Sequence, residues 1–204
     1  MGFRFRLPLI LFAWALSATV SVVRAAEEWK LVRTIEGVAV EARPTESGFN
    51  VHRGETRVCT DLAALESFVA DTSRFQDWIP YTRSARLLDR SPTDVVYYVR
   101  TTTPWPLKDR DMVYRISREE SDVDGIKLLI TGLPDYWPIS DKAERIRAAT
   151  GQWQLTPADS GIRVRYELYV HPGAAPAFVA NRRLATVVGQ TLANLASQFP
   201  CTRS

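Results

Sequence analysis

The segment Ile162–Val170 constrains the fold of this chain more than any other feature. Every second residue in it is apolar, and three of the four residues between them are charged. Successive side chains of a strand point to opposite faces, so this pattern predicts a strand with one buried and one solvated face. Shorter alternations at Met112–Ile116 and Ile126–Ile130, and the β-branched and aromatic run Thr93–Thr103, extend the prediction to an antiparallel sheet.

Weaker strand patterns and two short helical patterns complete this part of the chain. Strands are predicted at Val38–Ala42, Val51–Cys59 and Trp153–Leu155. Thr60 or Asp61 can cap a helix that runs through Ala70, and a second short helix is predicted over 72–78, where Pro80 stops it.

The longest predicted helix lies near the C-terminal end of the chain. Pro176 suits its first turn, and Pro200 ends it. Large apolar side chains recur along one face at steps of four, four, three and four, at Leu184, Val188, Leu192, Leu195 and Phe199. Small residues lie beside them, at Ala185, Gly189, Ala193 and Ala196. These small residues either allow close packing onto the sheet or leave volume for a ligand, and the sequence leaves both alternatives open.

Many strands, two short helices after the early strands and one long terminal helix predict an α+β fold. The specific expectation is a helix-grip fold, in which a curved antiparallel β-sheet wraps around the long C-terminal α-helix and encloses an interior cavity. No repeat, linker or low-complexity tract divides residues 26–204, so one domain is expected.

The first 25 residues have the pattern of a secretory signal peptide. Arg4 and Arg6 form a basic start, Leu9–Ala18 is an uncharged apolar run, and Val23-Arg24-Ala25 places small residues where a signal peptidase reads. The apolar stretch Leu7–Val23 is at the short limit of length for a bilayer span, which disfavours an uncleaved membrane anchor. We therefore expect cleavage after this tripeptide and a periplasmic or secreted protein.

Removal of this segment changes the charge of the protein. Three of the 26 basic residues leave with it and no acidic residue does, which leaves 23 basic against 23 acidic residues. No block of Lys and Arg remains that could follow a phosphate backbone, so nucleic acid is excluded as an expected partner.

The chain contains two cysteines, Cys59 and Cys201. In an oxidising compartment they are candidates for a disulfide, and two buried free thiols are the equal alternative. Neither belongs to a CxxC pair, and the two histidines lie far apart in sequence, so no metal site is expected. The chain also lacks a GxSxG motif, a Gly-rich phosphate loop and a cofactor fingerprint, so no cofactor is expected.

Three segments resemble a known family. Thr103–Tyr114 (TPWPLKDRDMVY) resembles the hairpin motif of START (steroidogenic acute regulatory protein-related lipid-transfer) domains, in which Pro-aromatic-Pro is followed by Arg-Asp and Val-Tyr. Arg147–Leu155 is similar to the family's segment with a basic residue, a glycine and an aromatic strand. Tyr169–Pro176, followed by Asn181, is similar to the turn that leads into its last helix. The order and spacing match over most of residues 29–200.

The resemblance implies a cavity that holds one sterol, phospholipid or similar apolar molecule, with structural roles for Arg110 and Asp111. The chain also departs from the family pattern. His171 stands where many members carry an aspartate. Ile116 and Val99 align with positions where several members have an arginine and its acidic partner, which favours a more apolar ligand, although Arg100 nearby could restore a charge.

We expect the inward faces of the strands and of the last helix to line this cavity. The expected ligand-binding residues are Tyr97, Val99, Met112, Tyr114, Ile116, Tyr166, Leu168, Leu184, Val188 and Leu192. Tyr136 and Trp137 lie between two prolines in Leu133–Ile139. This segment is interpreted either as a mobile lid that meets a membrane or as a cap on the core.

The sequence favours extracytoplasmic binding, and transfer, of a sterol, phospholipid or fatty-acid-like lipid by a monomer that contacts membrane transiently. An enzyme of the cyclase or aromatase type on the same scaffold needs a positioned acid or base. Its candidates are Tyr97, Tyr114, Tyr166, His52 and His171. His52 is expected to be solvated because charged residues surround it, and His171 is expected to hydrogen-bond a backbone group. We therefore expect a carrier and not an enzyme, with a packed structural module as a third alternative.

Overall fold

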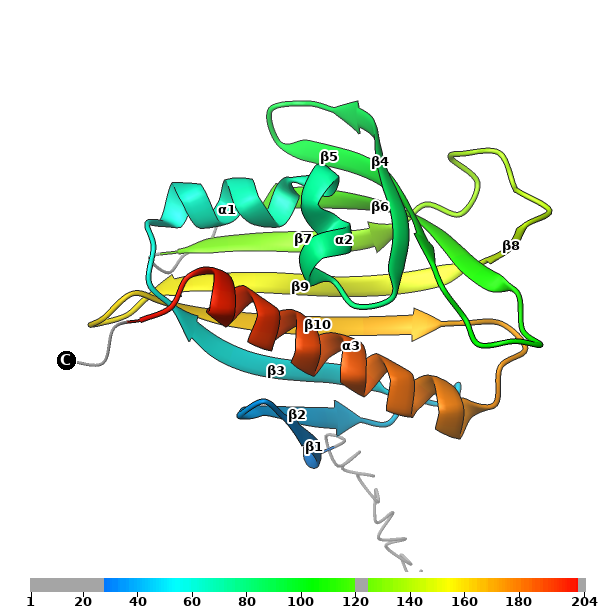
Figure 1. Ribbon diagram of the computed structural model, residues 1–204, viewed down its shortest axis with the longest axis horizontal. Helices are drawn as coiled ribbons and strands as arrows, with labels where there is room; N and C mark the ends of the chain where they lie inside the picture. Colours follow the sequence, from blue (N-terminus) through cyan, green and yellow to red (C-terminus); the bar gives the residue numbers. More distant parts are fainter. Residues whose placement is uncertain (1–27, 120–124, 202–204) are drawn as a thin grey trace, which may run out of the picture.

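A computed structural model describes residues 28–119 and 125–201 (Figure 1), so the predicted signal peptide lies outside the described residues. The elements in chain order are β1 (Lys30–Ile35), β2 (Val38–Arg43), β3 (Val51–Val58), α1 (Leu62–Ala70), the short 3₁₀ helix η1 (Thr72–Arg74), α2 (Phe75–Trp78), β4 (Thr82–Arg90), β5 (Asp94–Thr101), β6 (Asp109–Glu119), β7 (Ile126–Gly132), β8 (Ala143–Arg145), β9 (Ala148–Pro157), β10 (Ile162–His171) and α3 (Ala177–Gln198).

Within the described residues, ten strands form one sheet in the order β1-β2-β3-β10-β9-β7-β6-β5-β4, and the short β8 pairs with β6 off this path. All neighbours along the path are antiparallel, and only β8 is parallel to its partner. The long helix α3 crosses one face of the sheet, over β1, β2, β3 and β10, while α2 packs against β4 (Figure 1). The predicted helix-grip fold is therefore confirmed.

All of the predicted strands and helices are present, and the helix predicted over 72–78 is divided into η1 and α2. Asp61 caps α1, because its side chain accepts a hydrogen bond from the backbone N–H of Ala64 at 2.8 Å. Leu65, Phe68 and Val69 are the buried face of this helix. The sequence prediction missed β1, β4 and β8, and it made β9 too short.

Helix α3 rests directly on the sheet along its C-terminal part. A Cβ added at Gly189 would lie 2.9 Å from side-chain atoms of Ile35 and Val40, and one added at Gly54 would lie 2.9 Å from Leu192. At Gly189 the small residue therefore serves close packing, which decides between the two alternatives at that position. Among the described residues, no helix combines the length and the apolar character needed to cross a bilayer.

A buried ion pair links the hairpin motif to β8. The Arg145 guanidinium donates to both carboxylate oxygens of Asp111, with Nε–Oδ1 and Nη2–Oδ2 distances of 2.9 and 3.1 Å. The Asp111 side chain is fully buried and that of Arg145 is 2% exposed. The same guanidinium also donates to the carbonyl oxygens of Pro134, Trp137 and Pro138. One cation therefore pairs a buried carboxylate and holds the whole turn that follows β7.

The two cysteines form a disulfide, with a Cα–Cα distance of 5.0 Å. Cys59 follows β3 and Cys201 follows α3, and the backbone N–H of Cys59 donates to the carbonyl of Phe199 at 3.0 Å. The bridge thus fixes the C-terminal end of the long helix to the sheet.

His52 is buried at 1% exposure, so the expectation that it is solvated is wrong. Its neighbours along the chain are charged, but its partners across the sheet are Ala42 and Leu168, which are both buried. Burial lowers the pKa of His52 to about 4, and a hydrogen bond with the backbone of Asn50 opposes this only in part.

We expect the stability of the protein to fall as the pH is lowered from 6.5 to 4. In this range the unfolded chain binds a proton at His52 that the folded protein excludes, so acid favours unfolding. A pKa difference of this size corresponds to about 3 kcal/mol in all. Urea unfolding at several pH values should show that the His52→Leu variant lacks this part of the pH dependence. His171→Gln is the control, and an unchanged slope in the His52 variant would contradict the assignment.

Candidate ligand-binding cavity

A cavity of about 740 Å³ lies between the N-terminal half of α3 and the sheet. The walls come from α2, the turn between α2 and β4, strands β5, β6, β7, β9 and β10, and the loop between β5 and β6. The position of the cavity follows from how α3 packs on the sheet. The helix contacts the sheet near Gly189, but at residues 178–187 it lies over open space. The volume lies within the range of small-molecule sites.

Most of the interior surface is apolar or aromatic. Alternate residues of each strand face inward, as the pleat requires. The side chains that line the inner part are Phe75, Tyr97, Val99, Met112, Tyr114, Ile130, Ile146, Trp153, Tyr166, Leu168, Leu184 and Val187. Burial raises the pKa of Tyr97, Tyr114 and Tyr166 far above the ordinary value, so these phenols stay neutral.

Seven of the ten residues predicted from the sequence line this cavity. They are Tyr97, Val99, Met112, Tyr114, Tyr166, Leu168 and Leu184. The other three, Ile116, Val188 and Leu192, do not line it and belong to the packed core, with exposures of 4%, 0% and 0%. Val188 and Leu192 lie on the part of α3 that already touches the sheet, and Ile116 lies one inward step beyond Tyr114. Their assignment as ligand contacts is therefore corrected.

The cavity opens at a rim of exposed apolar side chains. Trp105 is 92% exposed and Phe178 is 76% exposed, although both line the cavity. Leu107, Val179 and Tyr81 are exposed lining residues of the same rim. We call these five residues the apolar rim. It joins the β5–β6 loop, the α2–β4 turn and the first turn of α3.

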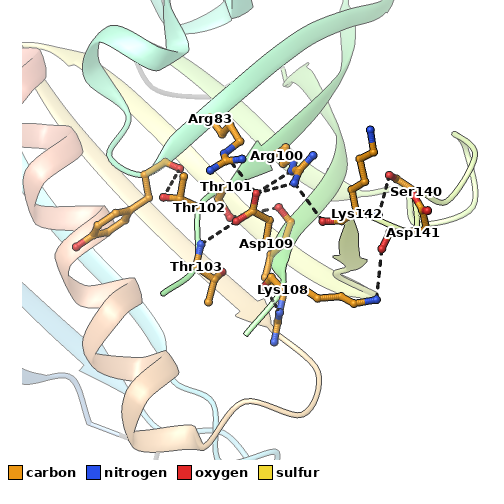
Figure 2. A network of polar contacts seen from close by, with 12 residues as sticks. Arg83, Arg100, Thr101, Thr102, Thr103, Lys108, Asp109, Ser140, Asp141 and Lys142 are labelled. Atoms are coloured by element: carbon orange, nitrogen blue, oxygen red, sulfur yellow. Dashed lines mark hydrogen bonds and ion pairs between the residues drawn. The ribbon is translucent and has the colours of Figure 1, made fainter. Parts of the chain in front are cut away.

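A polar network at Asp109 holds the base of the β5–β6 loop, as Figure 2 shows. The Asp109 carboxylate accepts hydrogen bonds from Arg100 Nε at 2.8 Å and from the backbone N–H of Thr103 at 3.1 Å, and Arg83 lies 3.4 Å away. Burial opposes ionisation here, but these donors and cations lower the pKa of Asp109 overall. Arg100 therefore serves this loop and does not line the cavity, so it does not restore a charge there.

Other arginines, which the sequence analysis did not single out for this role, line the cavity near the rim. These are Arg33, Arg110, Arg182 and Arg183. Arg110 is neutralised by Glu144 at 3.1 Å and donates to the carbonyls of Lys108 and Pro172.

Arg183 has no such carboxylate partner within the described residues. Its guanidinium lies 3.8 Å from the ring centroid of Tyr81 and donates to the carbonyl of Thr102. Burial and the nearby Arg110 lower its pKa, and Tyr81 opposes this shift. Tyr81 itself has a left-handed φ of 65°, a conformation in which its carbonyl accepts a hydrogen bond from the backbone N–H of Thr102 at 2.9 Å.

Tyr136 and Trp137 lie outside the cavity lining. Arg145 holds the carbonyl of Trp137, Arg86 lies 5.3 Å from its ring centroid, and the Tyr136 hydroxyl donates to Asp89 at 3.2 Å. In the structure this turn therefore contacts β4 and β8, and its role as a lid stays a prediction.

The histidines also lie outside the cavity lining. His171 accepts a hydrogen bond at Nδ1 from the backbone N–H of Gly173 at 3.3 Å, which confirms the backbone role expected for it. In the part of the chain that the structure describes, no group of three or more His, Cys, Asp or Glu residues is arranged to hold a metal ion.

A curved sheet that grips one long helix around an apolar cavity defines the helix-grip class of hydrophobic-ligand-binding proteins. Residues 67–196 match the family described as polyketide cyclase/dehydrase and lipid transport, and the chain belongs to this family. The resemblance to START domains is confirmed by the solved structure of a STAR-related lipid transfer protein from Xanthomonas axonopodis. That protein is 30% identical, with a TM-score of 0.77 over 83% of this chain and 97% of its own.

The chain is also similar to two further proteins. An uncharacterised protein of Pseudomonas aeruginosa, PA1579, is 28% identical over 84% of this chain and 87% of its own length. The human StAR-related lipid transfer protein 5 is 19% identical, with a TM-score of 0.68 over 86% of this chain and 88% of that chain, which shows a shared fold.

Proposed function

We propose that this protein carries a lipid outside the cytoplasm and exchanges it at membrane surfaces without changing it chemically. The observation that carries the proposal is the apolar cavity of about 740 Å³ that opens through the apolar rim. Burial of apolar surface contributes roughly 25 cal/mol per Å², so a lipid-sized ligand gains several kcal/mol without special chemistry.

Carriage rather than catalysis is supported by the chemistry of the lining. Among the residues that the structure describes, its ionisable side chains are arginines and the tyrosines Tyr81, Tyr97, Tyr114 and Tyr166. Burial raises the pKa of the three inner tyrosines, so they keep their protons at neutral pH and are poor general bases. A cyclase acting on a bound polyketide needs a group that exchanges a proton at neutral pH.

Two features support a location outside the cytoplasm. The first is the signal-peptide pattern of residues 1–25. The second is the Cys59–Cys201 disulfide, because such bridges persist mainly in oxidising compartments. N-terminal sequencing of exported protein should begin at Ala26, and a retained Met1 would contradict cleavage.

Filling the cavity should abolish carriage while the fold survives. We expect Val187→Trp, which places an indole in the cavity, to weaken lipid binding by about tenfold or more, equal to 1.4 kcal/mol. Because the new side chain enters open space, its cost in stability should stay below that of overpacking a filled core. Native mass spectrometry of protein mixed with extracted lipids measures the bound fraction.

Leu87→Trp is the matched control, since Leu87 is exposed on β4 and does not line the cavity. It should bind lipid as the unmodified protein does. If the unmodified protein binds no lipid, and Val187→Trp unfolds it, the packed structural module is the better description.

The apolar rim should be the part that meets the membrane. We expect Trp105→Ser combined with Phe178→Ser to lower association with lipid vesicles by about tenfold or more, because two exposed rings lose their contact with the bilayer. Sedimentation with vesicles that contain anionic lipid measures this. Trp137→Ser is the control, and a larger loss there than at the rim would identify Tyr136 and Trp137 as the membrane contact.

A further inference from the structure

Two tyrosine hydroxyls inside the cavity have no partner in the described protein. Tyr97 and Tyr166 are 4% and 7% exposed and line the cavity. The third inner tyrosine, Tyr114, differs because its hydroxyl donates to the sulfur of Met112. Over residues 28–119 and 125–201, the side-chain polar atoms that are both fully buried and without a partner belong to other residues. The Tyr97 and Tyr166 hydroxyls are therefore not fully enclosed by protein atoms, and they face the open space of the cavity.

Both rings are held in place by aromatic neighbours. Tyr166 stacks on Trp153, with ring centroids 3.8 Å apart and an interplanar angle of 8°. Tyr97 packs edge-on against Phe75 at 5.1 Å. Both side chains line the same cavity. The two donors are therefore fixed in direction before any ligand arrives.

The chemistry of these donors restricts what can fill the cavity. A neutral phenol donates a hydrogen bond to a hydroxyl or carbonyl oxygen. A hydrocarbon pressed against both groups would displace their water and leave two buried donors unpaired, which is unfavourable. A site built around hydrogen-bond donors discriminates against the analogue that lacks the oxygen.

We propose that the carried molecule is an amphiphile whose buried end bears an uncharged oxygen, a hydroxyl or a carbonyl, which Tyr97 and Tyr166 receive. This inference rests on the proposed carriage of a lipid and names its chemical class. The ligand enters with this oxygen foremost and leaves its apolar body against the aliphatic walls and the apolar rim.

The test compares 1-dodecanol with dodecane, each competing for the cavity with the neutral fluorescent probe N-phenyl-1-naphthylamine. The unmodified protein should prefer the alcohol by about tenfold, the value expected when one or two hydrogen bonds are lost. In the combined Tyr97→Phe and Tyr166→Phe variant the preference should fall to about twofold or less. Tyr169→Phe is the matched control, because Tyr169 lies outside the cavity lining and its hydroxyl contacts Ser47 Oγ at 3.1 Å.

The outcomes separate this inference from the proposed function. Equal competition by both molecules in the unmodified protein overturns the inference but leaves carriage standing. A preference that survives the combined substitution also overturns it and places the oxygen elsewhere, for example at the rim. If neither molecule nor the probe binds, the proposed function itself fails. Thermal unfolding of each variant confirms that it is folded, since the substitutions remove only oxygen atoms.

Discussion

Replacing Asp111 by alanine is expected to lower the free energy of unfolding by about 3–5 kcal/mol. Asp111 is fully buried, and its carboxylate accepts two hydrogen bonds from Arg145. Removing it leaves a guanidinium charge buried without its counter-charge. The same loss should loosen the turn at 134–138, because the Arg145 guanidinium that holds its carbonyls loses its own anchor. Urea unfolding measures the difference.

The exposed pair Asp135 and Arg147 is the control for this prediction. Their side chains are 84% and 60% exposed at a separation of 3.0 Å, and such pairs contribute little. Asp135→Asn should therefore leave stability almost unchanged. Asp111→Leu combined with Arg145→Met should cost less than the sum of the single changes, because neither charge is then left alone. Additive losses would show that the two groups do not act as a pair.

Removal of the disulfide is expected to cost about 5 kcal/mol in the chain-entropy model. The bridge joins cysteines 142 positions apart, so it restricts most of the unfolded chain. Cys59→Ser and Cys201→Ser should have nearly the same effect, and the two together should cost no more than either alone. Unfolding of the oxidised protein by guanidinium, with and without reductant, provides the measurement.

The variant that lacks both cysteines is the control for this measurement, because reductant should not change its stability. A loss below about 1 kcal/mol would mean that the unfolded chain keeps structure that already holds these ends together.

The central strands could be predicted because burial of one face of a strand produces alternating apolar and polar residues in the sequence. In β10 one face meets the core, and Ile162, Val164, Tyr166 and Leu168 are all buried. The edge strands β1 and β4 have no such contrast, since β1 is exposed along most of its length and β4 is nowhere fully buried. In β3 both Val51 and His52 are buried, so the charged neighbours of His52 misled the interpretation of its environment.

The sequence predicted which side chains share the inward face of each strand and of the last helix. It could not predict how these faces are spaced from one another. Strand alternation placed Tyr97, Val99, Met112 and Tyr114 on one face, and all four line the cavity. Helical periodicity likewise grouped Leu184, Val188 and Leu192. It contains no information on how far each helical turn stands from the sheet, and only Leu184 lies over open space. The apolar rim and Arg183 depend on tertiary contacts between distant segments, which no local pattern records.

The two edge strands of the open sheet also affect whether copies of this protein associate with one another. An unpaired edge can template strand addition from a second chain. Here the register shifts once along β1, between Leu31 and Arg33, and twice along β4. Both strands also carry exposed cations, among them Lys30 and Arg86. Irregular, charged edges are poor templates for β-pairing, so the protein can keep an apolar opening on its surface without offering a straight backbone edge for polymerisation.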